Sequence, residues 1–318
     1  MHNLNNVRLG NSDLFVSRVG LGLWPIAGMT SLEVNDADSL ATIEAAREGG
    51  INFFDTAYCY GADGVSERLL GRAIRHCRGD VIIATKCGVH WAADLSRVND
   101  ASPARLRHEC EESLRRLGID QVDLLYLHSP DRITPIESSA AAMAELQRCG
   151  KAKTIGVSNA TLEETQKFHA VCPLTVVQPR YNMFQREIEQ DLVPWCQANG
   201  VSIVSYWPLM KGLLAGKIRR GHQFDPRDKR LSYPIFQPPQ WERAQNLIDE
   251  LEILATQAGV TIAQLVVAWT IARPGITSVL CGAKRPWQIA ETLQAMNLSL
   301  TPQTLSAIND AIARHLSA

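Results

Sequence analysis

Short apolar runs alternate with longer amphipathic stretches over almost the whole length of this chain. Apolar runs of this length are typical of buried strands, whereas the stretches between them repeat apolar residues every three or four positions, as helices packed on one face do. We predict eight strands, at Ser17–Gly22, Asn52–Asp55, Asp80–Thr85, Val122–His128, Lys153–Ser158, Thr175–Gln178, Val201–Tyr206 and Thr277–Cys281.

Helical segments follow most of these strands. One opens at Ser102-Pro103, where the serine can cap the helix and the proline suits its first turn. Another opens at Thr161, whose spacing from Glu164 is that of a capping box. The apolar face of the first helix is expected to consist of Leu106, Cys110, Leu114 and Leu117.

Strand–helix units without a hairpin-rich block indicate a parallel α/β sheet with right-handed crossovers. Closing that sheet gives a (β/α)8 TIM barrel, and leaving it open gives a doubly wound fold. Ahead of the first unit, residues 7–10 and 14–17 flank Asn11-Ser12-Asp13, which predicts an N-terminal β-hairpin that closes the bottom of the barrel. The stretch from Gly212 to about Gln240 shows no clear pattern, and a loop of this length is usually functional or mobile.

Composition narrows the class of protein. A chain of 318 residues, 46% of them hydrophobic, can bury a large core, and α/β barrels of this length form one unit. We therefore expect residues 1–318 to form a single domain. The 32 basic and 33 acidic residues leave a net charge of −1, which speaks against nucleic acid or an anionic membrane as a partner.

Cysteine usage and hydropathy indicate the compartment. The 8 cysteines are scattered without a C-x-x-C pair, and no apolar run approaches the roughly 20 residues that span a bilayer. The first residues, Met1–Asn6, are polar and lack the apolar core of a secretory signal. We expect a cytoplasmic protein with reduced thiols and without a metal site.

Polar side chains stand at the ends of successive predicted strands, where barrel enzymes carry their catalytic groups. Asp55 ends the second strand, and Tyr60 lies five residues later in a glycine-containing loop. Lys86 follows the third strand, and His128 ends the fourth. Each residue alone has a simpler explanation as a helix cap, a solvated side chain or a turn residue. Their ordered combination is what indicates catalysis.

Electrostatics predicts what this group does. An unperturbed tyrosine has a pKa of about 10, and a nearby ammonium favours the phenolate and lowers that pKa. We expect Lys86 to act on Tyr60 in this way, with Asp55 holding the lysine in place. Tyr60 is then a general acid for a carbonyl oxygen that gains negative charge, and His128 orients the carbonyl through a second hydrogen bond.

With these residues in place, the chain resembles the aldo-keto reductase superfamily. Gly50–Gly61 is similar to the family's aspartate-to-tyrosine signature, and Lys86 and His128 stand where the family's lysine and histidine are expected. The likeness covers about residues 7–312 and is closer to the prokaryotic and potassium-channel β-subunit-like branches than to the steroid-type branch. Further similar segments follow in the family's order, at Val65–Gly71, Gly156–Asn159, Val177–Asn182, Tyr206–Leu209, Gly212–Lys217 and Cys281–Lys284.

The resemblance implies an NADP-dependent reductase that binds NADPH (NADP+) without a Rossmann domain, and no G-x-G-x-x-G follows any predicted strand. It places Ser158, Asn159 and Gln178 at the nicotinamide carboxamide and Tyr206 against the ring. Lys284 and Arg285 are the candidates for the 2′-phosphate, since cations there would favour NADPH over NADH; solvated charges before a helix are the alternative. The other expected cofactor contacts are Gly22, Trp24, Asp55, Trp207, Pro208, Leu209, Gly212, Lys217, Gly282, Gln288 and Glu291.

Aromatic residues near the predicted mouth indicate an apolar pocket for a small carbonyl substrate. Trp24, Tyr58 and Trp91 are the expected substrate-binding residues, although each is also compatible with simple packing. Two other functions compete with a reductase. One is an NADPH-binding redox-sensing or regulatory subunit with little turnover. The other is a metal-dependent barrel hydrolase, which would need ligand clusters such as H-x-H, and the 8 histidines form none.

Overall fold

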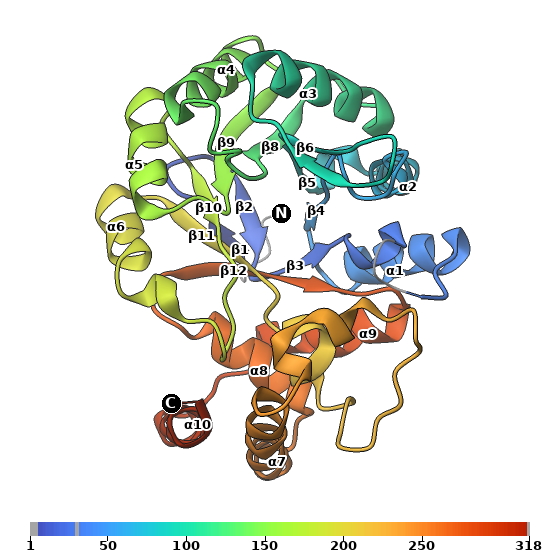
Figure 1. Cartoon of the computed structure of the whole chain (residues 1–318), viewed down its shortest axis with the longest axis vertical. Helices are drawn as coiled ribbons and strands as arrows, with labels where there is room; N and C mark the ends of the chain where they lie inside the picture. Colours follow the sequence, from blue (N-terminus) through green and yellow to red (C-terminus); the bar gives the residue numbers. More distant parts are fainter. Residues whose placement is uncertain (1–5, 29–31, 317–318) are drawn as a thin grey trace.

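Parallel strands form the centre of the protein. The computed structural model describes residues 6–28 and 32–316, and within these residues eight strands close into a barrel in the order β10-β11-β12-β3-β4-β5-β8-β9 (Figure 1). The closed barrel confirms the predicted TIM-barrel fold, and the open, doubly wound alternative is wrong. The barrel strands are β3 (Val19–Gly22), β4 (Phe53–Asp55), β5 (Ile82–Cys87), β8 (Val122–Leu127), β9 (Ala152–Ser158), β10 (Val176–Gln178), β11 (Ser202–Tyr206) and β12 (Ile276–Gly282), each close to a predicted strand.

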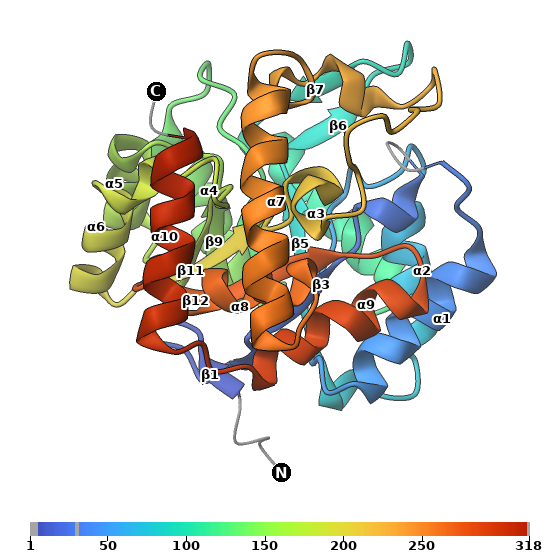
Figure 2. The same ribbon diagram turned by 90° about the horizontal axis from the view of Figure 1, so that it is seen from below.

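Helices surround the barrel and bury their apolar faces against it. The longest of them, α7, packs against α10 on the outside of the molecule (Figure 2). The helices are α1 (Asp36–Glu48), α2 (Val65–Ile74), α3 (Pro103–Leu117), α4 (Ile136–Arg148), α5 (Leu162–Val171), α6 (Leu192–Asn199), α7 (Gln240–Ala258), α8 (Ile262–Ile271), α9 (Pro286–Leu293) and α10 (Pro302–Leu316). Short 3-10 helices lie at η1 (Pro25–Ala27), η2 (Arg78–Asp80), η3 (Glu187–Glu189), η4 (Met210–Ala215), η5 (Lys229–Ser232), η6 (Pro234–Phe236) and η7 (Gln294–Asn297).

The observed starts of α5 and α3 can be compared with the predicted helix caps. At α5 the capping box is confirmed, because Thr161 and Glu164 exchange side-chain-to-backbone hydrogen bonds. α3 begins at Pro103 with Ser102 at its N-cap position, as predicted, but the Ser102 side chain bonds no helix amide. Its own amide instead donates to Asp100 Oδ1 at 3.0 Å, which fixes the turn before Pro103. The apolar face of α3 is buried as expected.

A β-hairpin closes one end of the barrel. β1 (Asn6–Arg8) pairs with β2 (Phe15–Ser17), and Figure 2 shows β1 at the end opposite to the β6–β7 hairpin (Val89–Trp91 with Arg97–Asn99). Leu9 and Leu14 pack against side chains from inside the barrel. The predicted hairpin and its position are therefore confirmed. The prediction about the polar N-terminus concerns residues that lie mostly outside the described part of the chain.

The barrel interior is tightly filled near Gly156 of β9. A Cβ added there would lie 2.5 Å from ring carbons of Tyr126 and 2.9 Å from the Val176 carbonyl oxygen. Glycine at this position is what leaves space for the buried Tyr126 ring.

The segment from Gly212 to Gln240, which showed no pattern, contains short 3-10 turns and an aromatic cluster. Phe224 and Phe236 of this segment pack edge-on or tilted on one another and on Trp241 of α7. Turns of this kind have no long periodicity to detect. Among the described helices, none alone is long and apolar enough to cross a membrane, although α7 and α8 together, across an 89° bend, meet the length and composition criteria.

Candidate active site

Adjacent strands bring the four predicted catalytic residues together at the carboxyl end of the barrel. Lys86 Nζ forms an ion pair with Asp55 and also donates to the Thr56 carbonyl at 2.9 Å. The same ammonium lies 3.3 Å from the hydroxyl of Tyr60. Lys86 and Asp55 are only 1% and 2% exposed, so this charge pair is almost fully removed from water.

The electrostatics of Tyr60 differs from the prediction. Burial raises the pKa of the Tyr60 phenol well above its ordinary value, and the negative charge of Asp55 raises it further. The expected lowering of this pKa is therefore wrong, because desolvation of the buried phenolate is the largest effect on it. Tyr60 keeps its proton at neutral pH.

His128 is the fourth member of this group. Its ring centroid lies 5.9 Å from that of Tyr60, and its Nδ1 is 3.6 Å from the sulfur of Cys59. Burial lowers the pKa of His128 well below its usual value, and the charges of Lys86 and Arg97 lower it further. The imidazole is neutral at physiological pH and can offer a single N–H to a ligand.

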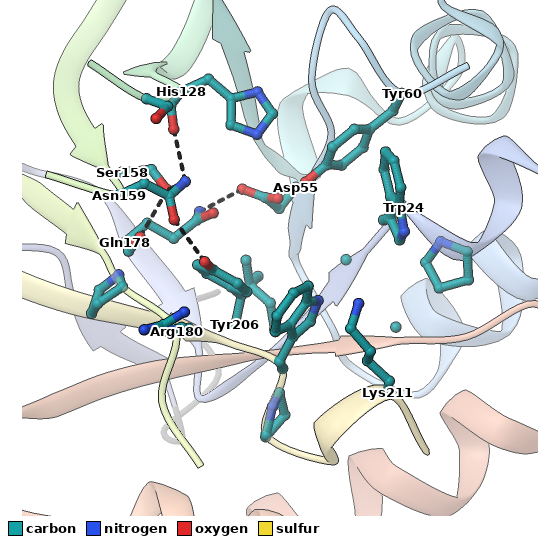
Figure 3. Close-up of a pocket in the computed structure, with 18 of the residues that line it drawn as sticks. Trp24, Asp55, Tyr60, His128, Ser158, Asn159, Gln178, Arg180, Tyr206 and Lys211 are labelled. Atoms are coloured by element: carbon teal, nitrogen blue, oxygen red, sulfur yellow. Dashed lines mark hydrogen bonds between the residues drawn. The ribbon is translucent and has the colours of Figure 1, made fainter. Parts of the chain in front are cut away.

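A hydrogen-bond network joins Asp55 and His128 to residues across the barrel mouth (Figure 3). Gln178 Nε2 donates to Asp55 Oδ2 at 2.8 Å. The Tyr206 hydroxyl donates to Asn159 Oδ1 at 2.6 Å, and the Asn159 amide donates to the His128 carbonyl at 2.9 Å. Asn159 itself has φ of 58°, a conformation that asparagine tolerates better than most residues. The network fixes the ring of Tyr206 beside the opening.

These residues border a cavity of about 1120 Å³ at the carboxyl ends of the strands. Most of the predicted cofactor residues line it, namely Gly22, Trp24, Asp55, Ser158, Asn159, Gln178, Tyr206, Trp207, Pro208, Leu209, Gly212, Gly282, Lys284 and Gln288. In the part of the chain that the structure describes, no group of three or more His, Cys, Asp or Glu side chains could hold a metal ion.

The comparison with known proteins matches this arrangement. The Aldo/keto reductase family model fits residues 18–313. The chain belongs to the aldo/keto reductase family. It is 36% identical to the aldo-keto reductase YhdN of Bacillus subtilis, over 97% of this chain and 94% of that protein. It is 32% identical to the NADH-specific methylglyoxal reductase of Escherichia coli, over 94% of this chain and 95% of that protein.

A solved relative shares the fold of this aldo-keto reductase closely. The glycerol dehydrogenase AKR11B4 from Gluconobacter oxydans superposes with a TM-score of 0.92 at 36% identity, covering 99% of this chain and 97% of that one. The predicted likeness to the prokaryotic branch is thereby confirmed. The chain is an oxidoreductase of a family that uses a nicotinamide cofactor on small carbonyl compounds.

Three of the predicted cofactor residues do not line the cavity of the reductase. Lys217 pairs with Glu291 at 2.6 Å and lies over the ring of Trp287. Arg285 pairs with Asp38 at 3.1 Å. The sequence did not indicate these pairs, because their partners are distant along the chain.

Of the predicted substrate residues, two line the cavity and one does not. Trp24 and Trp91 line the cavity, and the Trp24 ring stands edge-on to Tyr60 with centroids 4.9 Å apart. Tyr58 does not line it, because the guanidinium of Arg116 covers its ring at 4.2 Å. Tyr58 and Tyr60 are separated by one residue in an irregular loop, where no periodicity tells which ring faces inward.

Several cationic residues of the cavity were missed. Lys211 lies between two aromatic rings, 4.0 Å from the centroid of Tyr233, and has φ of 56°. Burial, then the charge of Arg230, lowers the pKa of Lys211 to about 8. Arg97, Arg132 and Arg180 also border the opening. Arg97 lies on the β6–β7 hairpin, whose three-residue strands are too short to give a periodic signal.

Proposed function

We propose that this aldo-keto reductase uses NADPH to reduce an aldehyde or ketone to an alcohol, with Tyr60 as the general acid. The observation that carries the proposal is the position of the Tyr60 hydroxyl, which lies 3.3 Å from Lys86 Nζ within the residues that line the cavity. Family membership supports the class of reaction, and the site supplies a proton donor suited to it.

The residues of the chain have separate roles in this proposal. When bound, the cofactor supplies the hydride that the carbonyl carbon accepts. Tyr60 holds its proton until the carbonyl oxygen gains negative charge, and then transfers that proton to the oxygen. Lys86 stabilises the phenolate that remains, and Asp55 fixes the lysine. Neutral His128 donates a hydrogen bond to the carbonyl oxygen and orients it.

The aromatic and cationic residues of the cavity lining suit a dinucleotide that carries phosphates. Tyr206 and Lys211 both line the cavity (Figure 3), and Lys284 adds a second cation to the lining. Lys284 Nζ donates to the Leu32 carbonyl at 2.7 Å, and it is the stronger candidate for the 2′-phosphate because Arg285 is paired with Asp38. This assignment supports NADPH as the proposed cofactor. A cytosolic location is also part of the proposal and rests on the pattern of cysteines.

Two measurements test the proposal together. Fluorescence titration with NADPH and with NADH should give tighter binding of NADPH, and Lys284→Ala should reduce that difference without weakening NADH. Comparable affinities for both cofactors in the wild type would remove the proposed role of Lys284.

Turnover is tested with a panel of aldehydes and NADPH. Tyr60→Phe should lose about 10²–10⁴-fold in kcat while still binding NADPH, since one general acid contributes that much. If wild type and Tyr60→Phe were equally inert although both bound NADPH, the chain would be a redox-sensing or regulatory subunit instead.

A further inference from the structure

Three arginines that border the cavity have no side-chain partner among the residues that the structure describes. Arg97, Arg132 and Arg180 are exposed at the opening, and among the described residues none of their guanidinium groups makes an ion pair or a hydrogen bond. Arg230, which also lines the cavity, is by contrast paired with Asp228 at 2.5 Å. Three unneutralised positive charges therefore face one space.

The loops that carry two of these arginines are tied together. Asp131 accepts hydrogen bonds from the amide of Ala101, which follows the β6–β7 hairpin, at 2.8 Å, and from the amide of Ile133 at 2.9 Å. Between them, Arg132 has φ of 61°, which is costly for a residue with a side chain and persists where the surroundings hold it. Arg97 and Arg132 are thus presented by a braced pair of loops.

The arginines lie on one side of the barrel mouth. They follow β5, β8 and β10, and these strands belong to the continuous arc β5-β8-β9-β10 of the barrel. Lys211 and Lys284 follow β11 and β12, on the other arc. Figure 3 shows Arg180 and Lys211 on opposite sides of Tyr206. The arginines therefore face the part of the cavity away from the cations proposed for the cofactor phosphates.

The positive charge of Arg97 affects the pKa values of Tyr60 and Tyr206. Burial raises the pKa of Tyr60, and Arg97 opposes that rise. Burial also raises the pKa of Tyr206, and the charges of Arg180 and Arg97 oppose it. Coulomb interactions weaken with distance, so these contributions agree with the position of both arginines in the lining of the same cavity.

Few negative charges balance the arginines. Among the described residues that line the cavity, the carboxylates are those of Asp55 and Glu187. Asp55 pairs with Lys86 and accepts a hydrogen bond from Gln178. Among the described lining residues, this leaves the carboxylate of Glu187 to offset the charge of the arginines. The substrate side of the cavity is therefore positive overall and suited to an anion.

We propose that the substrate of this reductase is an anionic carbonyl compound whose carboxylate or phosphate group is bound by Arg97, Arg132 and Arg180. Guanidinium groups bind both of these anions through paired hydrogen bonds. The proposal rests on the proposed function, because the carbonyl must lie at Tyr60 while the anionic group lies a few atoms away among the arginines.

Matched substrate pairs test the proposal. Reduction of 4-oxobutanoate is compared with that of butanal, and reduction of glyceraldehyde 3-phosphate with that of glyceraldehyde, all with NADPH. The anionic member of at least one pair should have a kcat/KM about tenfold higher or more, mainly through a lower KM, as expected for one charged hydrogen bond. The pair with the larger ratio shows whether a carboxylate or a phosphate is preferred. Added salt should reduce the preference.

Variants then assign the effect to the arginines. Arg97→Gln, Arg132→Gln and Arg180→Gln should each reduce the ratio of kcat/KM for the anionic over the neutral partner, and the triple variant should abolish it. Arg75→Gln is the matched control, because Arg75 is exposed and without a partner among the described residues but lies at the end of α2, outside the cavity lining. It should keep the wild-type ratio.

The outcomes separate the two proposals. If neutral aldehydes are reduced as well as anionic ones, or if the triple variant keeps the wild-type ratio, the anionic-substrate proposal is overturned and the reductase function stands. If the triple variant weakens NADPH binding without changing the ratio, the arginines serve the cofactor and the proposal is again overturned. If no aldehyde of either kind is reduced, the proposed function fails, and this inference fails with it.

Discussion

The ammonium of Lys211 lies 3.6 Å from the centroid of the Trp207 indole ring, at the wall of the cavity where the cofactor phosphates are expected. Both residues have positive φ angles, 56° and 59°. Trp207 therefore has a definite role: with Tyr233 it holds a lysine that has no carboxylate partner among the described residues.

This arrangement predicts a pH-dependent affinity for the cofactor. The pKa of Lys211 is lowered to about 8 by burial, then by Arg230, so the lysine is charged below that pH and neutral above it. The affinity for NADPH should be greatest below pH 8 and fall at higher pH, as the pyrophosphate loses a counter-charge. Fluorescence titrations from about pH 6 to about pH 10 measure this.

Lys211→Met should bind NADPH more weakly at neutral pH and show a flatter profile. Lys167→Met, which alters a lysine of the outer helix α5, should follow the wild type. An unchanged pH profile in Lys211→Met would contradict the role of the lysine.

A second pH effect is expected in stability. Glu109 of α3 is fully buried, accepts from the amide of Gly88 at 2.6 Å, and burial raises its pKa from 4.5 to about 7. The unfolded chain loses this proton near pH 4.5 and the folded chain only near pH 7. Stability therefore falls as pH rises between these values, by about 3 kcal/mol, and is then level.

Glu109→Gln should remove this part of the pH dependence while keeping an acceptor for Gly88. Denaturant unfolding of both proteins on either side of the window gives the difference. Glu111→Gln changes an exposed residue of the same helix and should keep the wild-type slope. Parallel slopes for wild type and Glu109→Gln would exclude the titration of Glu109.

Breaking the buried ion pair should affect folding as well as catalysis. Lys86→Met leaves the Asp55 carboxylate uncompensated in a site that is 2% exposed, which costs about 3–5 kcal/mol of unfolding free energy. The double variant Asp55→Asn/Lys86→Met should recover much of that loss but no activity. If the single variant were as stable as wild type, the pair would not be charged in the folded protein.

Overpacking of the barrel interior is expected at Gly156. Gly156→Ala places a methyl group 2.5 Å from the Tyr126 ring and should lower the unfolding free energy by about 1–3 kcal/mol. Gly79→Ala is the control, since nothing lies within 4 Å of its added carbon. Thermal unfolding of both variants distinguishes steric crowding from a general effect of replacing glycine.

The sequence predicts the features that depend on a local pattern, but not those that depend on burial or on contacts between distant residues. The barrel strands are short apolar runs, so the sequence predicts each of them near its observed bounds. Asp55, Lys86 and His128 could be singled out because they are the polar residues at the ends of such runs. The pKa of Tyr60 was predicted in the wrong direction, because the sequence does not reveal how deeply a loop residue is buried. Lys217 pairs with Glu291, 74 residues away, and such pairs leave no periodic signal.

The hydrogen bond from Gln178 to Asp55 has a consequence for when the site is completed during synthesis of the chain. It joins residues 123 positions apart, on strands from opposite parts of the barrel. The lysine and aspartate can meet when β4 and β5 pair, but the second oxygen of the carboxylate gains its partner only after β10 has been made and the ring has closed. The proposed catalytic site is therefore complete only in the closed ring of strands, and a chain released before β10 would carry the Asp55–Lys86 ion pair without the hydrogen bond from Gln178.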